Sequence, residues 1–325
     1  MTWEEVKQRS ILDFSSTALE VFRFQWENNT VYREFCDALK IRVDQITSVE
    51  KIPFLPIETF KNRKVVTGNW PESTRFTSSG TTGQVASIHS IRFLQDYLSI
   101  CLELFENQFG SLSNTSIFSL LPGYLERQGS GLVSMMEEVM KHAAQPSGFY
   151  LNQWEALNQA IQDARQKGHR IILLGVTFAL LEAAENQRLT LNAEDIVVET
   201  GGMKGRRKEI TRTELHEVLK KGLGVSQIFS EYGMTELMSQ AYFQPESGRF
   251  LPAPWMKILV RDPLAPTQLL NFGQAGGLQV IDLGNLHSCA FLATGDVGKV
   301  WKDGSFEVMG RFDSAEVRGC NLLVQ

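Results

Sequence analysis

The order of apolar and polar residues along the chain predicts helices first and then an alternation of strands and helices. Within the first forty residues the apolar positions of LEVFRFQW recur at helical spacing, and Thr2 with Glu5 forms a capping box at the start of a helix. Pro53 and Pro56 exclude a helix and a central strand from KIPFLPIETFK, so this segment is expected to run extended over the body. After it, strands are expected at residues 64–67, 116–121, 170–175, 195–200 and 226–230, and helices at 91–109, 132–142, 153–167, 177–186 and 211–221. Such alternation predicts an α/β fold with parallel strands covered on both faces.

The pattern changes at about residue 246. From there, Gly, Pro and Asp separate short apolar runs, which are KILVR, GLQVIDL, FLATGD, GKVWKDG and SFEVMGR. Runs of this kind indicate antiparallel strands or a small barrel. We therefore expect three parts in the 325 residues: a helical and extended segment at 1–63, an α/β body at 64–245 and a β-rich section at 246–325.

Composition and charge exclude several classes of protein. Apolar residues make up 43% of the chain and charged residues 21%, which is ordinary for a globular protein with a core. The net charge of −5 gives no reason to expect a nucleic-acid or anionic-membrane partner, and no apolar run is long enough to span a bilayer. The start, MTWEEVKQRS, does not have the pattern of a secretory signal. Cys36, Cys101, Cys289 and Cys320 have neither metal spacing nor a disulfide pattern, so we expect a soluble cytoplasmic protein with reduced thiols.

The stretch FTSSGTTGQ, residues 76–84, combines two glycines with five hydroxyl side chains. The residues on both sides alternate between apolar and polar, so the stretch is expected to join two strands, unlike a Walker loop, which leads into a helix and carries a lysine. Its glycines permit close approach of an anion, and its N–H and hydroxyl groups can cradle phosphate oxygens. A flexible Ser/Gly turn is the alternative. The candidate phosphate-binding residues are Thr77, Ser78, Ser79, Gly80, Thr81, Thr82 and Gly83.

S-S-G-T-T-G resembles the phosphate-loop signature of adenylate-forming enzymes, which include acyl-CoA synthetases, peptide-synthetase adenylation domains and luciferases. The usual continuation, Gly-x-Pro-Lys, is replaced here by Gly-Gln-Val-Ala, so the lysine is missing. EYGMTE at 231–236, TGD at 294–296 and GRFD at 310–313 match three further motifs of the family in the correct order. The resemblance implies the large-domain fold of that family: layered sheets covered by helices, with a small β-barrel-like C-terminal section.

The resemblance also implies roles in binding ATP and Mg²⁺. Tyr232, beside Gly233, offers a ring for stacking on adenine. Thr235 provides a hydroxyl for the α-phosphate, and Glu236 provides a carboxylate for Mg²⁺. Taken alone, the same residues are also typical of a turn at the end of a strand.

The other matches add contacts to the nucleotide. By resemblance, Asp296 accepts hydrogen bonds from the ribose hydroxyls, Arg311 contacts ribose or phosphate, and the backbone of Gly201 and Gly202 lies against adenine. A tripeptide such as TGD is equally typical of a hairpin turn. Without a loop lysine, the positive charge near the phosphates is expected from Mg²⁺, Arg311 or Lys204.

One branch of this superfamily resembles the chain most. IPFLPIETFK, LPGYLERQGSGL and RGCNLLV are similar to segments of the long-chain acyl-protein synthetases, the ligase component of the fatty-acid reductase system of bacterial bioluminescence. The chain ends twelve residues after Asp313, so the usual C-terminal domain with its catalytic lysine is expected to be absent. The resemblance implies that Cys320 receives the acyl group, and Arg318 is a neighbour that would favour its thiolate. The alternative for Cys320 is a small buried residue in a last strand.

The acid itself is expected near the run LPGYLERQGSGL at 121–132. By resemblance, Tyr124, Gly129 and Gly131 line the carboxylate end of the acyl pocket, while the alternative is a loop followed by a helix N-terminus. The five histidines show no acid partner in the sequence and are expected to be structural or exposed. The basic run at 204–208 is expected to be a solvated face.

Together these observations predict that a long-chain fatty acid and ATP give acyl-adenylate and pyrophosphate. The acyl group would then form a thioester, on Cys320 and afterwards on a reductase or another thiol acceptor. Two alternatives remain open: activation of an aryl carboxylate, as in ligases resembling phenylacetate–CoA ligase or in phenazine-type antibiotic pathways, and a carrier that binds nucleotide and acid without turnover.

Overall fold

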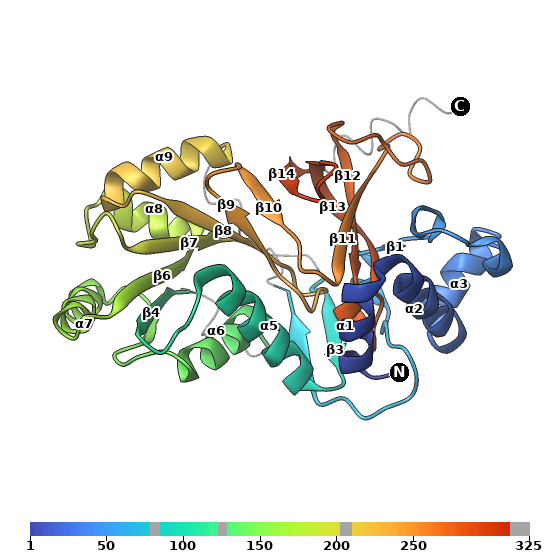
Figure 1. Cartoon of the computed structure of the whole chain (residues 1–325), viewed down its shortest axis with the longest axis horizontal. Coiled ribbons are helices and arrows are strands. Elements are labelled where there is room, and N and C mark those ends of the chain that lie inside the picture. Colours follow the sequence, from blue (N-terminus) through green and yellow to red (C-terminus); the bar gives the residue numbers. More distant parts are fainter. Residues whose placement is uncertain (79–84, 123–128, 202–209, 313–325) are drawn as a thin grey trace. The chain divides into compact units, whose positions relative to one another are not determined.

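The computed structural model of the chain describes residues 1–78, 85–122, 129–201 and 210–312 (Figure 1). It contains two compact units, and each consists of segments that are not contiguous in the sequence. Unit 1 comprises Met1–Asp96, Thr235–Ser239 and Arg249–Gln325, and unit 2 comprises Tyr97–Met234 and Gln240–Gly248. The division into three consecutive segments, expected from the sequence, describes the order of elements along the chain and stays a prediction.

Unit 2 is built on a mixed sheet with the strand order β9-β8-β7-β6-β4-β5. Five of its strands are parallel, and only β9 runs antiparallel to its neighbour β8. The bounds are β4 Thr115–Leu120, β5 Gly148–Tyr150, β6 Arg170–Val176, β7 Ile196–Thr200, β8 Ile228–Tyr232 and β9 Ala241–Gln244. Strands β4 and β6 are buried almost throughout because helices cover both faces of a parallel sheet. The predicted α/β fold is confirmed, as are the expected strands at 116–121, 170–175, 195–200 and 226–230, to within two residues.

Helices lie on both faces of this sheet. Figure 1 shows α8 and α9 on one face and α5 and α6 on the other. The bounds are α5 Leu94–Phe109, α6 Gly131–Lys141, α7 Trp154–Gln166, α8 Thr177–Glu185 and α9 Arg212–Leu223. A capping box of Thr211 and Glu214 starts α9, and Gly224, with φ of 75°, ends it. All five expected helices are confirmed, although α5 starts later than expected because Ile91 belongs to a strand.

Unit 1 contains an antiparallel sheet with the order β11-β12-β13-β14-β10. The bounds are β10 Arg249–Leu251, β11 Met256–Arg261, β12 Gly276–Asp282, β13 Phe291–Val300 and β14 Phe306–Arg311. The antiparallel strands expected after residue 246 are confirmed. However, FLATGDVGKV forms the single strand β13, with a register shift after Val297, so the alternative of a hairpin turn at TGD is wrong.

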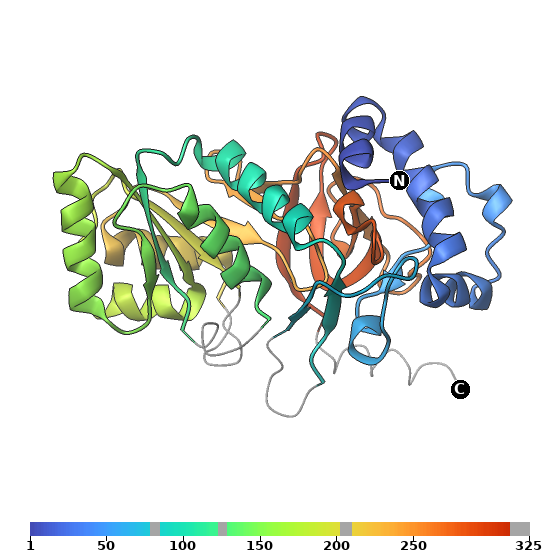
Figure 2. The same ribbon diagram turned by 90° about the horizontal axis from the view of Figure 1, so that it is seen from below.

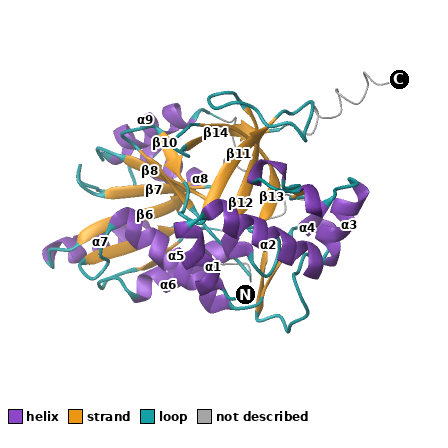
Figure 3. Cartoon of the chain, turned by 45° about the vertical axis from the view of Figure 1, so that its right-hand side comes forward, coloured by secondary structure: helices purple, strands orange, loops and turns teal. Residues whose placement is uncertain are grey.

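The N-terminal part of unit 1 is helical and packs on this sheet (Figures 2 and 3). Helices α1 Trp3–Leu12, α2 Phe14–Asn28 and α3 Thr30–Ala38 are separated by the capping residues Asp13 and Asn29. Phe291 of β13 stacks on Tyr32 and meets Phe22 edge to face, with ring centroids 6.1 and 6.2 Å apart. The expected N-terminal helices and the Thr2–Glu5 capping box are confirmed.

The segment after these helices differs in part from the prediction. In KIPFLPIETFK, β1 Leu55–Pro56 pairs in parallel with β13, and α4 Thr59–Asn62 follows at once, so only the first half is extended. Residues 64–67 form no strand; instead, Thr67 donates its amide proton to the carbonyl of His287 at 2.9 Å. Single-turn 3₁₀ helices lie at η1 Val43–Gln45, η2 Val49–Lys51 and η3 Leu283–Asn285.

The remaining strands of unit 1 form a hairpin. β2 Thr74–Thr77 pairs antiparallel with β3 Ile88–Ile91, which confirms that the glycine–hydroxyl stretch joins two strands. Residues 79–84 between them lie outside the described part of the chain. Among the helices that the structure describes, none is both long and apolar enough to cross a bilayer.

Candidate active site

The base of the β2–β3 hairpin is closed by two hydrogen bonds between Ser78 and Ser87. The amide of Ser78 donates to the carbonyl of Ser87 at 3.1 Å, and the amide of Ser87 donates to Oγ of Ser78 at 2.9 Å. Thr77 is the last residue of β2. The bonds hold together the two ends of the predicted phosphate loop. Ser79, Gly80, Thr81, Thr82 and Gly83 lie outside the described residues, so their contact with phosphate stays a prediction.

Glu236 lies beside this hairpin in unit 1. Its side chain is buried, and burial raises its pKa above the ordinary value of a glutamate. A hydrogen bond from Ser87 and the positive charges of Arg311 and Lys61 oppose that rise. The structure therefore brings three predicted elements of the site into one neighbourhood: the stem of the loop, Glu236 and Arg311. Lys61, on α4, was not identified from the sequence.

Asp296 and Arg311 are partners across the β13–β14 ladder. Nε of Arg311 donates to Oδ1 of Asp296 at 2.8 Å, while the amide of Asp296 donates to Oγ1 of Thr294 at 3.1 Å. The aspartate side chain is 7% exposed and the arginine side chain 71% exposed. A buried carboxylate held by an accessible guanidinium is a suitable acceptor for vicinal hydroxyls, and the predicted roles of both residues stay open to test.

A second arginine, Arg261, was missed by sequence analysis. It donates to the carbonyls of Leu278 and Thr294 at 3.1 and 2.7 Å. Burial lowers its pKa, and the charges of Glu58 and Asp296 counteract that effect. In the sequence it was only the last residue of an apolar run, with no motif to mark it. Because it bonds the carbonyl of Thr294, the first residue of TGD, Arg261 can hold the backbone that carries Asp296.

In unit 2 the predicted residues lie at one edge of the sheet. The carboxyl ends of parallel strands meet at a common edge, and ligands of open α/β sheets bind there, at the point where the strand order reverses. Here that point lies between β4 and β6. The chain passes from β4 to β5 on one side of β4, and then continues with β6 on its other side. The loop of Tyr124 follows β4, Gly201 follows β7, and Tyr232 ends β8. Tyr124 and Gly202 lie outside the described residues.

The glycines at this edge have distinct geometries. Gly129 and Gly201 have φ of 80° and 73°, in the left-handed region that favours glycine. Gly131 is the first residue of α6, and Ser130 caps that helix by accepting from the amide of Val133. The helix N-terminus expected as an alternative is therefore confirmed, and the acid pocket stays a prediction. A Cβ on Gly233 would lie 2.3 Å from a carboxylate oxygen of Glu231, so a larger residue would displace that side chain.

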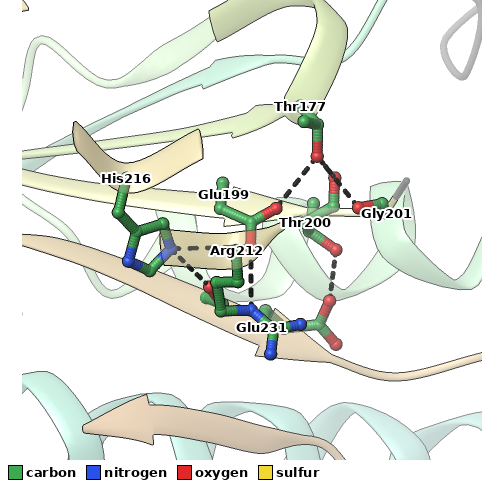
Figure 4. Close-up of polar contacts among 8 residues, drawn as sticks. Thr177, Glu199, Thr200, Gly201, Arg212, His216 and Glu231 are labelled. Atoms are coloured by element: carbon green, nitrogen blue, oxygen red, sulfur yellow. Dashed lines mark hydrogen bonds and ion pairs between the residues drawn. The ribbon is translucent and has the colours of Figure 1, made fainter. Parts of the chain in front are cut away.

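Glu199, which is buried, and Glu231, which is half-buried, form a polar cluster at the same edge (Figure 4). On one face, Oγ1 of Thr177 lies 2.9 Å from both a carboxylate oxygen of Glu199 and the carbonyl of Gly201. On the other face, Thr200 bonds Glu231. Burial raises the pKa of Glu231 to about 7; Thr200 opposes the rise and the negative charge of Glu199 adds to it. The cluster thus ties together the ends of β6, β7 and β8, from which the predicted adenine-binding segments start.

Two side chains of α9 lie beside the carboxylate of Glu199. Arg212 and His216 lie 3.8 and 3.9 Å from its carboxylate, and Nε2 of His216 is 3.0 Å from Oγ of Ser230. Burial raises the pKa of Glu199, but nearby His216 and the charge of Arg212 lower it overall. The pairing of His216 with Glu199 was missed because the two residues lie in different elements.

Tyr232 is buried, 8% exposed, at the end of β8. Its stacking on adenine stays a prediction. Thr235 and Glu236 of the same EYGMTE motif belong to unit 1, whereas Tyr232 and Gly233 belong to unit 2.

The described residues contain no group of three metal-ligating side chains. Glu236 fits the predicted magnesium role, because Mg²⁺ in nucleotide sites is commonly held by one or two carboxylates together with substrate phosphates. The described cysteines, Cys36, Cys101 and Cys289, are buried, and burial raises the pKa of Cys36 to about 12. They are core residues, as expected, and poor nucleophiles. Cys320 lies outside the described residues.

The chain is similar in sequence and in fold to known proteins. Residues 1–104 match the family model described as acyl-protein synthetase, LuxE. The long-chain-fatty-acid–luciferin-component ligase of Vibrio harveyi is 24% identical over 93% of this chain and 84% of the relative, and the enzyme of the same name from Aliivibrio fischeri is 22% identical over 98% and 89%. A crystal structure of 2-hydroxyisobutyryl-CoA ligase with 2-HIB-AMP and CoA superposes with a TM-score of 0.67 at 14% identity, covering 91% of this chain and 73% of that one. The chain is thus similar to the LuxE acyl-protein synthetases and has the fold of the adenylate-forming ligases.

Proposed function

We propose that the chain is an ATP-dependent ligase that activates a carboxylic acid, a long-chain fatty acid, as its acyl-adenylate. One observation carries the proposal most directly. In unit 1 the closed stem of the phosphate loop, the buried carboxylate of Glu236 and the Asp296–Arg311 pair occur together, as adenylate formation requires. The similarity to ligases named for long-chain fatty acids supports the choice of acid.

In the proposed first step, an oxygen of the fatty-acid carboxylate attacks the α-phosphorus of ATP. The bond from the α-phosphorus to the bridging oxygen breaks, pyrophosphate leaves, and acyl-adenylate remains. The Thr235 hydroxyl would donate a hydrogen bond to the α-phosphate, and Arg311 would offset the negative charge that develops there. Asp296 would hold the ribose through its hydroxyls. Gly201 and Tyr232 would contact adenine.

Glu236 would hold Mg²⁺, which screens the phosphate charge when bound. Ser87 lies beside this carboxylate and favours its charged form. The loop has no lysine, so Arg311 and Lys61, whose charges already act on Glu236, would contribute the fixed positive charge of this region.

In the proposed second step, a thiolate attacks the acyl carbon, a thioester forms and AMP leaves. We propose Cys320 as this thiol, and a reductase or another protein thiol as the next acceptor. The resemblance described above and the names of the relatives support this assignment.

The test combines pyrophosphate exchange with intact mass spectrometry. The protein is incubated with ATP, Mg²⁺ and a panel of fatty acids of different chain length and aryl acids, alongside Cys320→Ser and, as a matched control, the buried Cys289→Ser. Acid-dependent exchange in all three proteins, with a hydroxylamine-labile acyl adduct missing only in Cys320→Ser, is the expected result. Exchange without an adduct would refute Cys320 as acceptor. Exchange with aryl acids alone would refute the fatty acid, and ATP binding without exchange would refute the ligase.

A further inference from the structure

Two buried side chains hold the backbone of Thr235 and Glu236 in unit 1. Nδ1 of His89 lies 2.8 Å from the carbonyl oxygen of Thr235. Nδ2 of Asn285 donates to the carbonyl oxygen of Glu236, also at 2.8 Å. His89 and Asn285 are each 1% exposed, so water does not compete for these bonds. Two consecutive peptide groups are therefore fixed by partners distant in the sequence.

The proton on His89 is assigned by its partners. A carbonyl oxygen only accepts, so Nδ1 must carry the proton that is donated to Thr235. Nε2 then accepts from Oγ of Ser288, which lies 2.9 Å away. Burial lowers the pKa of His89 to about 4, which keeps the ring neutral in this tautomer, and Phe60 packs edge to face against it at 5.5 Å.

Asn285 and Ser288 belong to one short loop between β12 and β13, and the N-terminal helices anchor that loop. Nε2 of Gln25 donates to the carbonyls of Asn285 and Leu286 at 2.8 and 3.1 Å, while Oε1 of Gln25 accepts from the amide of Ala290 at 2.9 Å. Nδ2 of Asn29 donates to the carbonyl of Ser288 at 2.8 Å. Gln25 and Asn29 are completely buried.

We propose that His89 and Asn285 are positioning residues for the reaction. Gln25 and Asn29 anchor the loop that carries Asn285, so the N-terminal helices also help to position the reacting groups. The inference rests on the proposed function, because that function gives Thr235 and Glu236 their contacts with phosphate and metal. Buried amide and imidazole groups cost free energy unless their polar atoms find partners. Both ring nitrogens of His89 and Nδ2 of Asn285 have partners, whereas Oδ1 of Asn285 has none among the described residues. Here the donors converge on the carbonyls of the two motif residues, so the network fixes where the Thr235 hydroxyl and the Glu236 carboxylate are held.

The sharpest test compares two substitutions of one side chain. An asparagine amide reaches the position of Nδ1, and a glutamine amide reaches that of Nε2. Both His89→Asn and His89→Gln lose the ring and its contact with Phe60, but only the asparagine keeps the bond to Thr235 and only the glutamine keeps the bond to Ser288. We expect both variants to lose similar Tm. The kcat for acid-dependent pyrophosphate exchange should fall about 100-fold in His89→Gln and less than about tenfold in His89→Asn, because misplaced catalytic groups cost that much.

A second comparison concerns the N-terminal helices. Gln25→Met preserves side-chain volume and removes the three bonds to the loop. Thr17→Val on the same helix is its control, since among the described residues the Thr17 hydroxyl bonds only the carbonyl of Asp13, the N-cap of that helix. We expect Gln25→Met to lower kcat about tenfold with an unchanged KM for the acid, and Thr17→Val to leave both within about threefold.

Hydrogen exchange of the peptide that contains Thr235 and Glu236 gives a readout without substrate. Faster exchange in His89→Gln and Gln25→Met, but not in His89→Asn and Thr17→Val, is the expected pattern. Equal kcat in the two His89 variants would overturn the inference. Equal hydrogen-exchange rates of this peptide in all four variants would also overturn it. If the wild type does not catalyse pyrophosphate exchange, the proposed function fails, whereas the hydrogen-exchange pattern still decides whether the network holds this segment.

Discussion

The substitution Glu231→Gln isolates the effect of one half-buried carboxyl group on stability. Glu231 lies in unit 2 beside the charged Glu199, and its other titratable neighbours are Tyr97 of α5 and Tyr242 of β9. It keeps its proton in the folded chain up to a pH of about 7, whereas in the unfolded chain it titrates near 4.5. Between these values the folded chain binds more protons than the unfolded chain, so the free energy of unfolding falls as pH rises. A glutamine keeps the shape and the contact with Thr200 but cannot ionise.

The size of the effect follows from the two pKa values. From pH 5 to pH 8 the wild type should lose about 2.5 kcal/mol of stability that Glu231→Gln retains. In a unit of about 150 residues this corresponds to a relative Tm shift of about 5 to 10 °C. Calorimetric scans of both proteins at pH 5, 6, 7 and 8 give the difference in Tm at each pH. Groups that titrate equally in both proteins do not contribute to this difference. The two Tm values should be similar at pH 5, and the variant should have the higher Tm at pH 8.

Glu199→Gln is the matched control. The pKa of Glu199 is lowered by His216 and Arg212, so its charge stabilises the fold above pH 4.5 and this contribution is lost as pH falls. Glu199→Gln should therefore be less stable than the wild type at pH 8, and the deficit should shrink toward acid. If the difference in Tm between wild type and Glu231→Gln changes by less than about 1 °C from pH 5 to pH 8, then Glu231 titrates at its ordinary pKa.

Three further substitutions test other parts of the structure. Glu236→Gln should reduce Mg²⁺-dependent pyrophosphate exchange about 100-fold, while calorimetric titration shows ATP binding without Mg²⁺ nearly unchanged; equal exchange in both proteins would exclude a metal role. Asp296→Asn should raise the Kd for ATP about tenfold and that for 2′-deoxy-ATP less, with little change in Tm because its partner Arg311 is 71% exposed; equal effects on both nucleotides would exclude a ribose contact. Phe291→Ala should destabilise unit 1 by about 3 to 5 kcal/mol in urea unfolding, since its ring packs against three other aromatic rings; a loss below about 1 kcal/mol would contradict that packing.

Periodicity and local chemistry were sufficient to predict the elements that place the candidate site. The α/β alternation located four of the parallel strands, so the GG and EYGMTE motifs could be expected at strand ends. GG comes directly after β7, and EYGMTE begins with the last two residues of β8. Alternation on both sides of TSSGTTG predicted the hairpin of β2 and β3. These predictions succeeded because strands and turns depend on neighbours within a few residues. The strand expected at 64–67 failed because tertiary hydrogen bonds decide the backbone there.

Contacts between distant residues could not be predicted in this way. His89 meets the carbonyl of Thr235 across 146 positions, and Gln25 meets the loop of Asn285 across 260. A histidine in IHSI and a glutamine in RFQW have no local feature that sets them apart from structural or exposed residues. Their significance comes from complete burial together with a polar partner, and burial of that kind is a property of the packed unit rather than of a short segment.

The missing lysine of the loop shows how the two kinds of information combine. Local sequence established that the charge is absent and suggested Arg311 or Lys204 as its source; Lys204 lies outside the described residues. The structure adds that Arg311 and Lys61 both act on Glu236 at the stem of the same hairpin. Lys61 reaches this position because β1 pairs with β13 and the chain then turns at once into α4, which the prolines had led us to expect as extended. Positive charge in unit 1 is thus supplied from a strand end and a short helix, where it also offsets the cost of burying the Glu236 carboxylate.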